Sequence, residues 1–313
     1  MHRLVDAAIF VISIFVPIRN AADLARQCLG SLAYSIRALH AEASVEYILL
    51  DDASPPDCHI PQVMLDFRGG VPSPVQILRF KTHRHYTAAC AYGFSVSRGA
   101  QVILVSHDMM VTPSYLRTLL AVAASDSSLG IIRGTSAHMD NSVHRCVPPA
   151  PLGSYEQIVR FSAYVAELHG LSVGSEPLLV GDSMLIQRSV LERIGVMDQR
   201  FVGFLGDVDF GLRAQRAGFK IVCAKGAWLH HAGCGTINAD LAAGRAQRDK
   251  IQEGLSDLDR AVEQLGRKWA VPLPASFAQW QMAQFDALRA AGIPEGGEFV
   301  PPVLPEEQVC EVL

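Results

Sequence analysis

The stretch Val45-Glu-Tyr-Ile-Leu-Leu-Asp-Asp-Ala-Ser54 decides the fold class. A short apolar run that ends in acidic and small polar residues is typical of a buried strand that opens into a loop. Similar runs occupy residues 9–16, 75–80 and 102–105, and the last of them ends in Ser106-His107-Asp108. Strands that are apolar on both faces indicate a parallel sheet covered by helices on both sides.

Helical patterns fill the intervals between these strands. Residues 24–39 carry apolar side chains three and four positions apart, and Asn20 is the expected N-cap. We expect further helices over residues 87–97 and after Thr112-Pro113, where threonine caps and proline occupies the first turn. Such alternation predicts right-handed crossovers, and ligands of these sheets bind beyond the carboxyl ends of the strands. The acidic residues at 51–52 and 108 are therefore expected to share one crevice.

The second half of the chain continues the pattern less regularly. Residues 134–176 show little periodicity and are expected to form a long loop, and residues 178–186 are expected to form a strand. Ser189-Val-Leu-Glu192 matches a capping box, which predicts a helix that ends at Gly195.

An acidic segment and a histidine pair follow. In Gly206-Asp-Val-Asp-Phe-Gly-Leu-Arg213 two carboxylates open a short helix that Gly218 stops. A strand is expected over residues 219–223, and His230-His231 lie at the next loop. Two carboxylates and an imidazole can hold a metal ion and deprotonate a hydroxyl group.

The remainder of the chain is expected to be an extension of the main domain. Residues 251–269 predict an amphipathic helix, a second helix is expected around residues 277–288, and a tail rich in proline and glutamate follows. We expect the main domain to cover residues 1–236, in two halves at about 1–133 and about 134–236. Residues 237–313 are the C-terminal helical extension, whose long helix offers a surface for an oligomer or a partner protein.

Composition narrows the class of protein. Half of the 313 residues are hydrophobic, 19% are charged and the formal net charge is −4, which predicts a folded protein without the basic face of a nucleic-acid binder. Seven cysteines without a C-x-x-C pair indicate reduced thiols in a cytosolic protein. The apolar run at residues 7–17 is shorter than the ~20 residues of a membrane span and lacks a small-residue cleavage site. We therefore expect a cytoplasmic protein, at most peripheral to a membrane, with no nucleic-acid partner.

The order of these segments resembles the family 2 glycosyltransferases, enzymes of the GT-A fold that use nucleotide-sugar donors. The resemblance extends from about residue 11 to residue 269. In chain order it is carried by Val11-Ile-Ser-Ile-Phe-Val-Pro-Ile-Arg-Asn20, Tyr47-Ile-Leu-Leu-Asp-Asp-Ala-Ser54, Ala100-Gln-Val-Ile-Leu-Val-Ser-His-Asp108, Val111-Thr-Pro113, Val180-Gly-Asp-Ser-Met-Leu-Ile-Gln-Arg188, Ile194-Gly-Val-Met-Asp198, Gly206-Asp-Val-Asp-Phe-Gly-Leu-Arg213 and Ala227-Trp-Leu-His-His-Ala-Gly-Cys-Gly-Thr236.

The resemblance implies a fold and a reaction. The fold is α/β of the GT-A type, with a Rossmann-like, mainly parallel sheet flanked by helices. Residues 1–236 would be the catalytic domain, with the nucleotide-sugar half at about 1–133 and the acceptor half at about 134–236. The reaction is an inverting, metal-assisted transfer of a sugar from a nucleotide sugar, a UDP-sugar in the first place. The acceptor is a hydroxyl group of a glycan, a lipid-linked molecule or a protein, as in polysaccharide biosynthesis.

The resemblance also implies a donor site and a metal site. Asp51 and Asp52 would hydrogen-bond the base and ribose. The same nucleotide site would include Pro17, Ser54, Arg84 and His107. Asp108 takes the last position of the family's D-x-D motif, and with His231 it would hold Mn²⁺ or Mg²⁺ against the diphosphate.

On the acceptor side, the resemblance makes Asp207 the general base. The residues expected to support it are Gly181, Asp182, Asp209 and His230. Asp207 can also be read as a plain helix cap, Arg84 as a solvated charge and the histidine pair as hydrogen-bonded side chains.

The chain departs from the family's pattern at three places. Ser106 replaces the first acidic residue of D-x-D, Gly206 replaces a glutamate, and His83-Arg-His85 replaces an Asn-x-Gly loop. These departures keep open a catalytically impaired relative that binds a nucleotide or a partner. A nucleotidyltransferase is a second alternative, although Val16-Pro-Ile-Arg-Asn20 is no glycine-rich phosphate loop. The absence of G-x-G-x-x-G after the first strand disfavours a dinucleotide-binding oxidoreductase.

Overall fold

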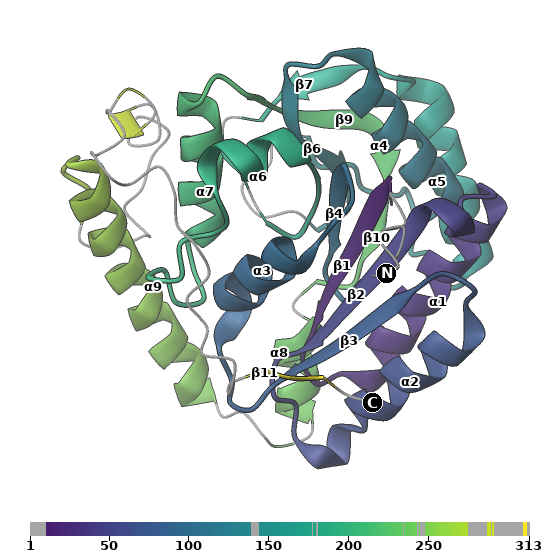
Figure 1. Cartoon of the computed structure of the whole chain (residues 1–313), viewed down its shortest axis with the longest axis horizontal. Coiled ribbons are helices and arrows are strands. Elements are labelled where there is room, and N and C mark those ends of the chain that lie inside the picture. The colour runs from purple at the N-terminus through teal and green to yellow at the C-terminus, as the bar shows by residue number, and fades with distance from the viewer. Residues whose placement is uncertain are drawn as a thin grey trace, which may run out of the picture.

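The central feature of the computed structural model is a nine-stranded sheet in the order β11-β3-β2-β1-β4-β8-β6-β9-β7 (Figure 1). The structure describes residues 11–138, 144–176, 178–179, 181–233, 235–242, 244, 248–274, 287–288, 290 and 309–311. The strands are β1 (Ile12–Ile18), β2 (Val45–Asp51), β3 (Val75–Phe80), β4 (Gln101–Val105), β6 (Leu129–Thr135), β7 (Val173–Ser175), β8 (Ser183–Gln187), β9 (Lys220–Trp228) and β11 (Val309–Glu311).

Parallel pairing joins β3, β2, β1 and β4, and also joins β6 to β9. Strand β8 lies antiparallel between β4 and β6, and the edge strands β7 and β11 are antiparallel to their neighbours. The predicted α/β class with a largely parallel central sheet is confirmed. The four parallel strands end on the same side, which brings the segments that follow β1, β2 and β4 together.

Helices cover both faces of the sheet (Figure 1). One layer holds α1 (Ala22–Ala38), α2 (Ile60–Gly70) and α4 (Pro113–Ser125), with α5 (Tyr155–His169) beside α4. The other layer holds α3 (His85–Val96), α6 (Arg188–Ile194) and α7 (Gly206–Arg216). The remaining elements are the short helices η1 (Glu42–Ser44) and η2 (Pro56–Cys58), the short strands β5 (Met109–Met110) and β10 (His230–His231), α8 (Gly235–Ala242) and α9 (Arg248–Trp269).

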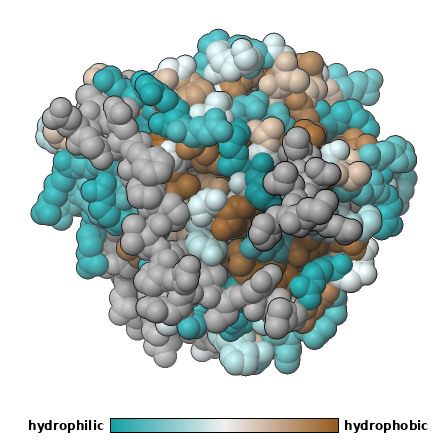
Figure 2. All heavy atoms as spheres, in the orientation of Figure 1, coloured by the Kyte–Doolittle hydropathy of each residue, from teal (hydrophilic) through white to brown (hydrophobic). Residues whose placement is uncertain are grey.

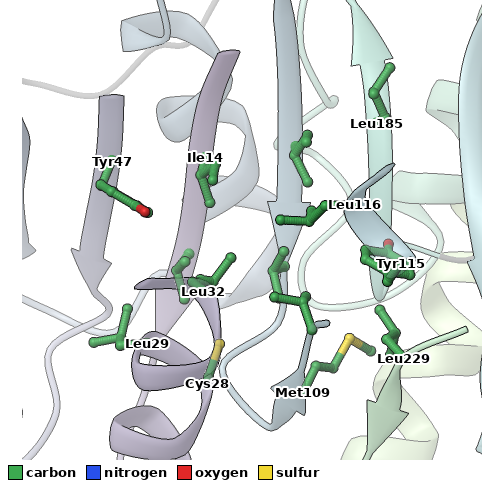
Figure 3. Packing of buried hydrophobic residues seen from close by; sticks show 14 of the residues in the cluster. Ile14, Cys28, Leu29, Leu32, Tyr47, Met109, Tyr115, Leu116, Leu185 and Leu229 are labelled. Atoms are coloured by element: carbon green, nitrogen blue, oxygen red, sulfur yellow. The ribbon is translucent and has the colours of Figure 1, made fainter. Parts of the chain in front are cut away.

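Alternating side chains explain why both faces are covered. Ile14 and Val16 of β1 point into the core beneath α1, whereas Phe15 between them points into the core beneath α3. Figure 3 shows the first of these cores, which holds Ile14 of β1 together with Leu29 and Leu32 of α1. A strand that is apolar at every position is therefore stable only between two helical layers, as the sequence indicated.

Two further predictions, on membrane-spanning segments and on the state of the cysteines, can be compared with the structure. No helix among the described residues is long and apolar enough to cross a bilayer. Figure 2 shows hydrophilic residues over much of the described surface of one face, with hydrophobic residues between them. The five cysteines whose side chains are described, Cys28, Cys58, Cys90, Cys146 and Cys223, are free thiols.

Two predicted helix caps are wrong and one is confirmed. Asn20 has a φ of 53° and is not the N-cap of α1, which begins after the left-handed residue Ala21. Ser189 lies inside α6, because that helix starts at Arg188. Thr112 does cap α4, since its hydroxyl accepts a hydrogen bond of 3.1 Å from the backbone N–H of Tyr115.

The region expected to be a long loop contains regular structure. Residues 134–176 include the end of β6, the whole of α5 and β7. Inward-facing Ile158, Ser162 and Val165 of α5 recur at helical spacing, and Ile158 and Val165 pack with Trp228.

Other boundaries also differ from the predictions. The strand expected from residue 178 begins only at Ser183, because Leu178 and Leu179 pack into two helical cores instead. β9 continues to Trp228, five residues beyond its expected end. The long helix is confirmed as α9, whereas the helix expected at 277–288 lies almost wholly outside the described residues. The division at residues 133/134 and 236/237 stays a prediction.

Candidate active site

The carboxyl ends of β1, β2 and β4 open into a cavity of about 520 Å³. This volume is within the range of small-molecule sites. The cavity is lined by Pro17, Ile18, Arg19, Asp52, His83, His85, Tyr86, Ala89, Ser106, His107, Asp108, Gly203, Phe204, His231, Gly235 and Asp240. Segments far apart in the sequence therefore meet at one place, as the strand pattern predicted for Asp52 and Asp108.

A two-stranded ribbon sets the geometry at one end of the cavity. β10 pairs antiparallel with β5, which places His231 opposite Met109. The Nε2 atom of His231 consequently lies 3.3 Å from Oδ2 of Asp108. The Nδ1–H of His231 donates to the carbonyl oxygen of His138 over 2.7 Å. This second hydrogen bond leaves the lone pair of Nε2 directed at Asp108 when the ring is neutral.

Asp108 and His231 modify each other's protonation. Burial alone would raise the pKa of Asp108, but the hydrogen bond and charge of His231 outweigh burial and hold it below its usual value. Burial would likewise lower the pKa of His231, but Asp108 and the charge of Asp182 raise it above 6.5. A proton on His231 therefore competes with any metal ion at this position.

The adjacent histidine has a different environment. Successive residues of a strand point to opposite sides, so His230 points away from Asp108. Its ring centroid lies 6.5 Å from that of Trp228, and burial lowers its pKa. The structure thus brings His231, and not His230, to the carboxylate.

The carboxylate and imidazole fit a partial metal site. Within the described part of the chain, no cluster of three or more His, Cys, Asp or Glu side chains is arranged to hold a metal ion. Asp108 and His231 supply one oxygen and one nitrogen ligand, and they open onto a cavity large enough for a diphosphate. Mg²⁺ usually binds through one or two carboxylates together with substrate phosphates, and imidazole suits transition metals. The residues fit a cation whose other ligands come from the donor and from water.

The two aspartates after β2 have different surroundings. Asp52 lines the cavity, where Oδ1 accepts from the backbone N–H of Arg84 over 2.7 Å and Oδ2 lies 3.2 Å from Nε2 of His83. Asp51 is fully buried and accepts hydrogen bonds from Arg79 and from the backbone N–H of Ser54. The structure thus brings Asp52 to the cavity and leaves Asp51 beneath it.

The other residues predicted to bind the nucleotide also fall into two groups, according to whether they line the cavity. Pro17 and His107 line the cavity, whereas Ser54 and the Arg84 side chain do not. Burial lowers the pKa of His107, and Asp108 and hydrogen bonds with the backbone of Pro17 only partly offset this. The hydroxyl of Ser54 accepts from the backbone N–H of Asn20 over 2.9 Å, so it fixes the loop after β1.

Asp207 lies in the first turn of α7 and does not itself line the cavity; it is linked to the cavity through Gly181. Its Oδ2 accepts from the backbone N–H of Gly181 over 2.8 Å, and Oδ1 accepts from that of Val208 over 2.9 Å. A Cβ atom at Gly181 would lie 2.9 Å from the Cβ of Asp207 and 3.0 Å from the hydroxyl oxygen of Tyr86, a cavity residue. Burial raises the pKa of Asp207, and the two backbone N–H groups only partly oppose this. A carboxylate of raised pKa is a stronger proton acceptor.

The glycine before Asp207 is required by packing. A Cβ atom at Gly206 would lie 2.5 Å from Cγ2 of Thr87. Helix α7 begins at Gly206 after Leu205, whose φ is 62°, and no side chain caps it. Asp207 is therefore inside the first turn, and the reading of Asp207 as the N-cap is wrong.

A buried ion-pair chain connects the metal position to the sheet. Nδ1 of His231 is 3.9 Å from Oδ2 of Asp182, and Oδ1 of Asp182 accepts from Nη2 of Arg133 over 2.5 Å. Arg133 is 1% exposed and also faces the buried carboxylate of Glu176 at 3.6 Å. Asp182 and Gly181 are consecutive, so a single short segment contacts both His231 and Asp207.

The sequence prediction missed several cavity residues. Arg19, Tyr86, Phe204 and Asp240 all line the cavity. Arg19 follows the first strand within the quoted pattern, which was a usable signal. Asp240 accepts hydrogen bonds of 2.8 and 2.9 Å from the Asn20 side chain, a pairing across 220 residues that no local pattern reveals.

Comparisons with known proteins agree with this architecture. The sequence model of glycosyl transferase family 2 matches residues 13–195, more than half of the chain. A search of curated protein sequences finds no significant match.

Solved structures share the fold at low sequence identity. S. aureus TarS 1–349 in complex with UDP is 14% identical with a TM-score of 0.54, over 89% of this chain and 69% of that one. Mannosyltransferase PcManGT from Pyrobaculum calidifontis, in complex with GDP-Man and Mn²⁺, is 15% identical with a TM-score of 0.52, over 90% and 81%. GalNAc-T7 with UDP, GalNAc and Mn²⁺ is 12% identical with a TM-score of 0.54, over 71% and 43%. The chain therefore has the fold of GT-A glycosyltransferases.

Proposed function

Because the chain belongs to glycosyl transferase family 2, we propose that it transfers a sugar from a nucleotide sugar to a hydroxyl acceptor, with inversion and with the help of a divalent metal ion. The observation that carries the proposal is the Asp108–His231 pair, 3.3 Å apart, at the end of a cavity of about 520 Å³. The cavity lies at the carboxyl ends of parallel strands, where sheets of this kind bind ligands.

The donor proposal rests on the composition of the cavity wall. Asp52 offers carboxylate oxygens to ribose hydroxyls, and Arg19 offers a cation to a phosphate. UDP is the first candidate nucleotide, since two of the structural neighbours were solved with UDP; a third was solved with GDP-Man, which makes GDP the comparison to test.

The metal proposal follows from the two ligands. Asp108 and His231 would hold Mn²⁺ or Mg²⁺, and the ion when bound stabilises negative charge on the departing diphosphate. Mn²⁺ was present in two neighbours, and an imidazole ligand is compatible with it.

Asp207 is the proposed general base. The acceptor oxygen forms a bond to the anomeric carbon while the bond from that carbon to the diphosphate oxygen breaks, and the hydroxyl proton passes to the Asp207 carboxylate. Attack from the face opposite the leaving group inverts the configuration. Burial raises the pKa of Asp207, which supports a role in accepting a proton.

Calorimetry tests the donor site, and turnover tests the reaction. UDP and GDP are titrated with and without Mn²⁺, and we expect one of them to bind more tightly with the metal. Release of nucleoside diphosphate from UDP-glucose, UDP-GalNAc or GDP-mannose, with water or glycerol as acceptor, then measures transfer. Absence of nucleotide binding under every condition contradicts the proposal.

A catalytically impaired, nucleotide-binding relative is the alternative that one observation favours. Thr87 occupies the space beside Gly206, where the family resemblance leads one to expect a glutamate. Nucleotide binding without turnover of any nucleotide sugar would establish this alternative.

A further inference from the structure

The last turn of α9 contacts the segment that carries the proposed base. The Lys268 ammonium donates to Oδ2 of Asp198 over 2.7 Å and to Oδ2 of Asp209 over 2.9 Å. The indole N–H of Trp269 donates to Oδ1 of Asp209 over 3.0 Å. Asp198 and Asp209 are the two ends of one stretch of chain, which includes Asp207. One ammonium group therefore joins both ends of this stretch.

The stretch between these two carboxylates forms part of the cavity wall. Gly203 and Phe204 line the cavity, and Asp207 follows three residues after Phe204. Residues 198–209 include the left-handed Leu205, with a φ of 62°, and Gly203, with a φ of 79°. Residues 199–205 lie outside any helix or strand, whereas residues 206–209 open α7, so the contacts at Asp198 and Asp209 act on both this loop and the helix turn that carries Asp207.

The side chains that make these contacts are buried. The side chain of Asp209 is 0% exposed and that of Lys268 is 7% exposed. Burial would raise the pKa of Asp198, but hydrogen bonds from Arg200 and Lys268 hold it well below its usual range. Asp209 also pairs with Arg213 over 2.9 Å and Asp198 with Arg200 over 2.5 Å, so Lys268 is the cation that the two carboxylates share.

Apolar packing supports the same contact. Phe201, Leu205 and Val208 form one core cluster with Val262, Leu265 and Trp269 of α9. Figure 1 shows α9 beside α7, outside the helices that cover the sheet. The apolar contact and the buried ion pairs of Lys268 therefore act on the same segment of chain.

We propose that Lys268 and Trp269 are positioning residues for Asp207: through Asp209 and Asp198 they fix the segment 198–209 so that the carboxylate faces the acceptor. The proposal rests on the proposed function of Asp207 as base. The C-terminal helix, which lies outside the family match at residues 13–195, is then part of the catalytic apparatus.

Substitutions in α9 test the proposal. Lys268→Met removes the ammonium and keeps most of the apolar stem, and Lys268→Arg restores a cation. Arg267→Met is the matched control, because Arg267 is 78% exposed and, among the described residues, its ion pair is with Glu263 on the same helix. Each full-length variant is measured for melting temperature, UDP affinity with Mn²⁺, and the pH profile of UDP release from UDP-glucose with glycerol as acceptor.

The expected pattern separates positioning from stability. Lys268→Met should bind UDP normally and lose ~10²-fold in kcat, the scale of an ångström misplacement of a reacting group. The acid limb of its pH profile should move to higher pH: Asp209 keeps its pair with Arg213, but the Lys268 charge is gone, and loss of a nearby cation raises the pKa of a carboxyl such as that of Asp207. Lys268→Arg should recover most of the rate, and Arg267→Met should match the wild type.

Other outcomes overturn the proposal. A Lys268→Met protein that melts lower but keeps kcat and its pH profile makes the contact purely structural. If Lys268→Met does not fold, Trp269→Phe serves instead, since it removes one donor to Asp209 and keeps an aromatic ring, and an unchanged kcat in that variant refutes the inference. Wild-type protein that releases no nucleoside diphosphate from UDP-glucose, UDP-GalNAc or GDP-mannose contradicts the proposed function itself, and that result is obtained before any variant is made.

Discussion

The substitution Asp207→Asn tests the proposed reaction most directly. The substitution keeps the shape of the side chain and removes its ability to take a proton. A positioned general base contributes ~10²–10⁴-fold to rate, which is ~3–5 kcal/mol in activation free energy. We therefore expect kcat for nucleoside diphosphate release to fall by at least ~10²-fold.

The structure predicts a much smaller effect on stability. The carboxylate of Asp207 accepts from the N–H groups of Gly181 and Val208, and an amide has only one oxygen to offer them. Losing one hydrogen bond costs about 1 kcal/mol. Burial disfavours the ionised form of Asp207, which is why its pKa is raised, and neutral asparagine escapes that penalty above the folded-state pKa. These two effects oppose each other, so the melting temperature should change by only a few degrees.

The assay combines three measurements on one preparation. Thermal unfolding reports the fold, calorimetry with UDP and Mn²⁺ reports the donor site, and UDP release reports transfer. Asp126→Asn is the matched control, because Asp126 also accepts from a backbone N–H, that of Ser128, and it does not line the cavity. An Asp207→Asn protein that folds, binds UDP and keeps a rate near that of the wild type refutes the general-base assignment.

Further predictions concern the metal and the packing before α7. His231→Ala should abolish the effect of Mn²⁺ on UDP affinity in calorimetry, and His230→Ala should leave it, since only His231 faces the carboxylate; equal losses would contradict this. Asp108→Ala should weaken the Mn²⁺ effect more than UDP affinity without metal. Because the pKa of His231 is raised and its proton competes with metal, Mn²⁺ affinity should fall as pH drops through that pKa, and a flat profile between pH 5.5 and 8 would exclude His231 as a ligand. Gly206→Ala should destabilise the fold by ~1–3 kcal/mol in denaturant titration, because its Cβ would lie 2.5 Å from Thr87; an unchanged midpoint would contradict the packing argument.

The sequence by itself determined the sheet and the site at its edge. Apolar runs ending in Asp51-Asp52 and in Asp108 predicted parallel strands whose ends meet, and Asp52 and Asp108 do line one cavity. Such predictions succeed because strand periodicity and polar strand ends are local properties of the chain. The amphipathic helix α9 was predictable for the same reason.

Predictions from local sequence patterns were wrong where a contact with a distant segment determined the structure. Asn20 is a good N-cap by composition, but its amide binds Asp240 on α8 and its backbone is left-handed. Helix α5 looked like a loop until Trp228 gave its inner face a partner.

Only the tertiary structure decided the different roles of Asp51 and Asp52, and it gives the physical reason for the choice of His231 over His230 that the resemblance made. The alternation of β10 against β5 directs His231 and not His230 toward Asp108. Burial separates Asp51, held by Arg79 and Ser54, from Asp52 in the cavity. The contact of Lys268 with Asp209 likewise joins residues 59 positions apart. Adjacent residues of one type are equivalent in a sequence, and they become different only when packing gives each its own neighbours.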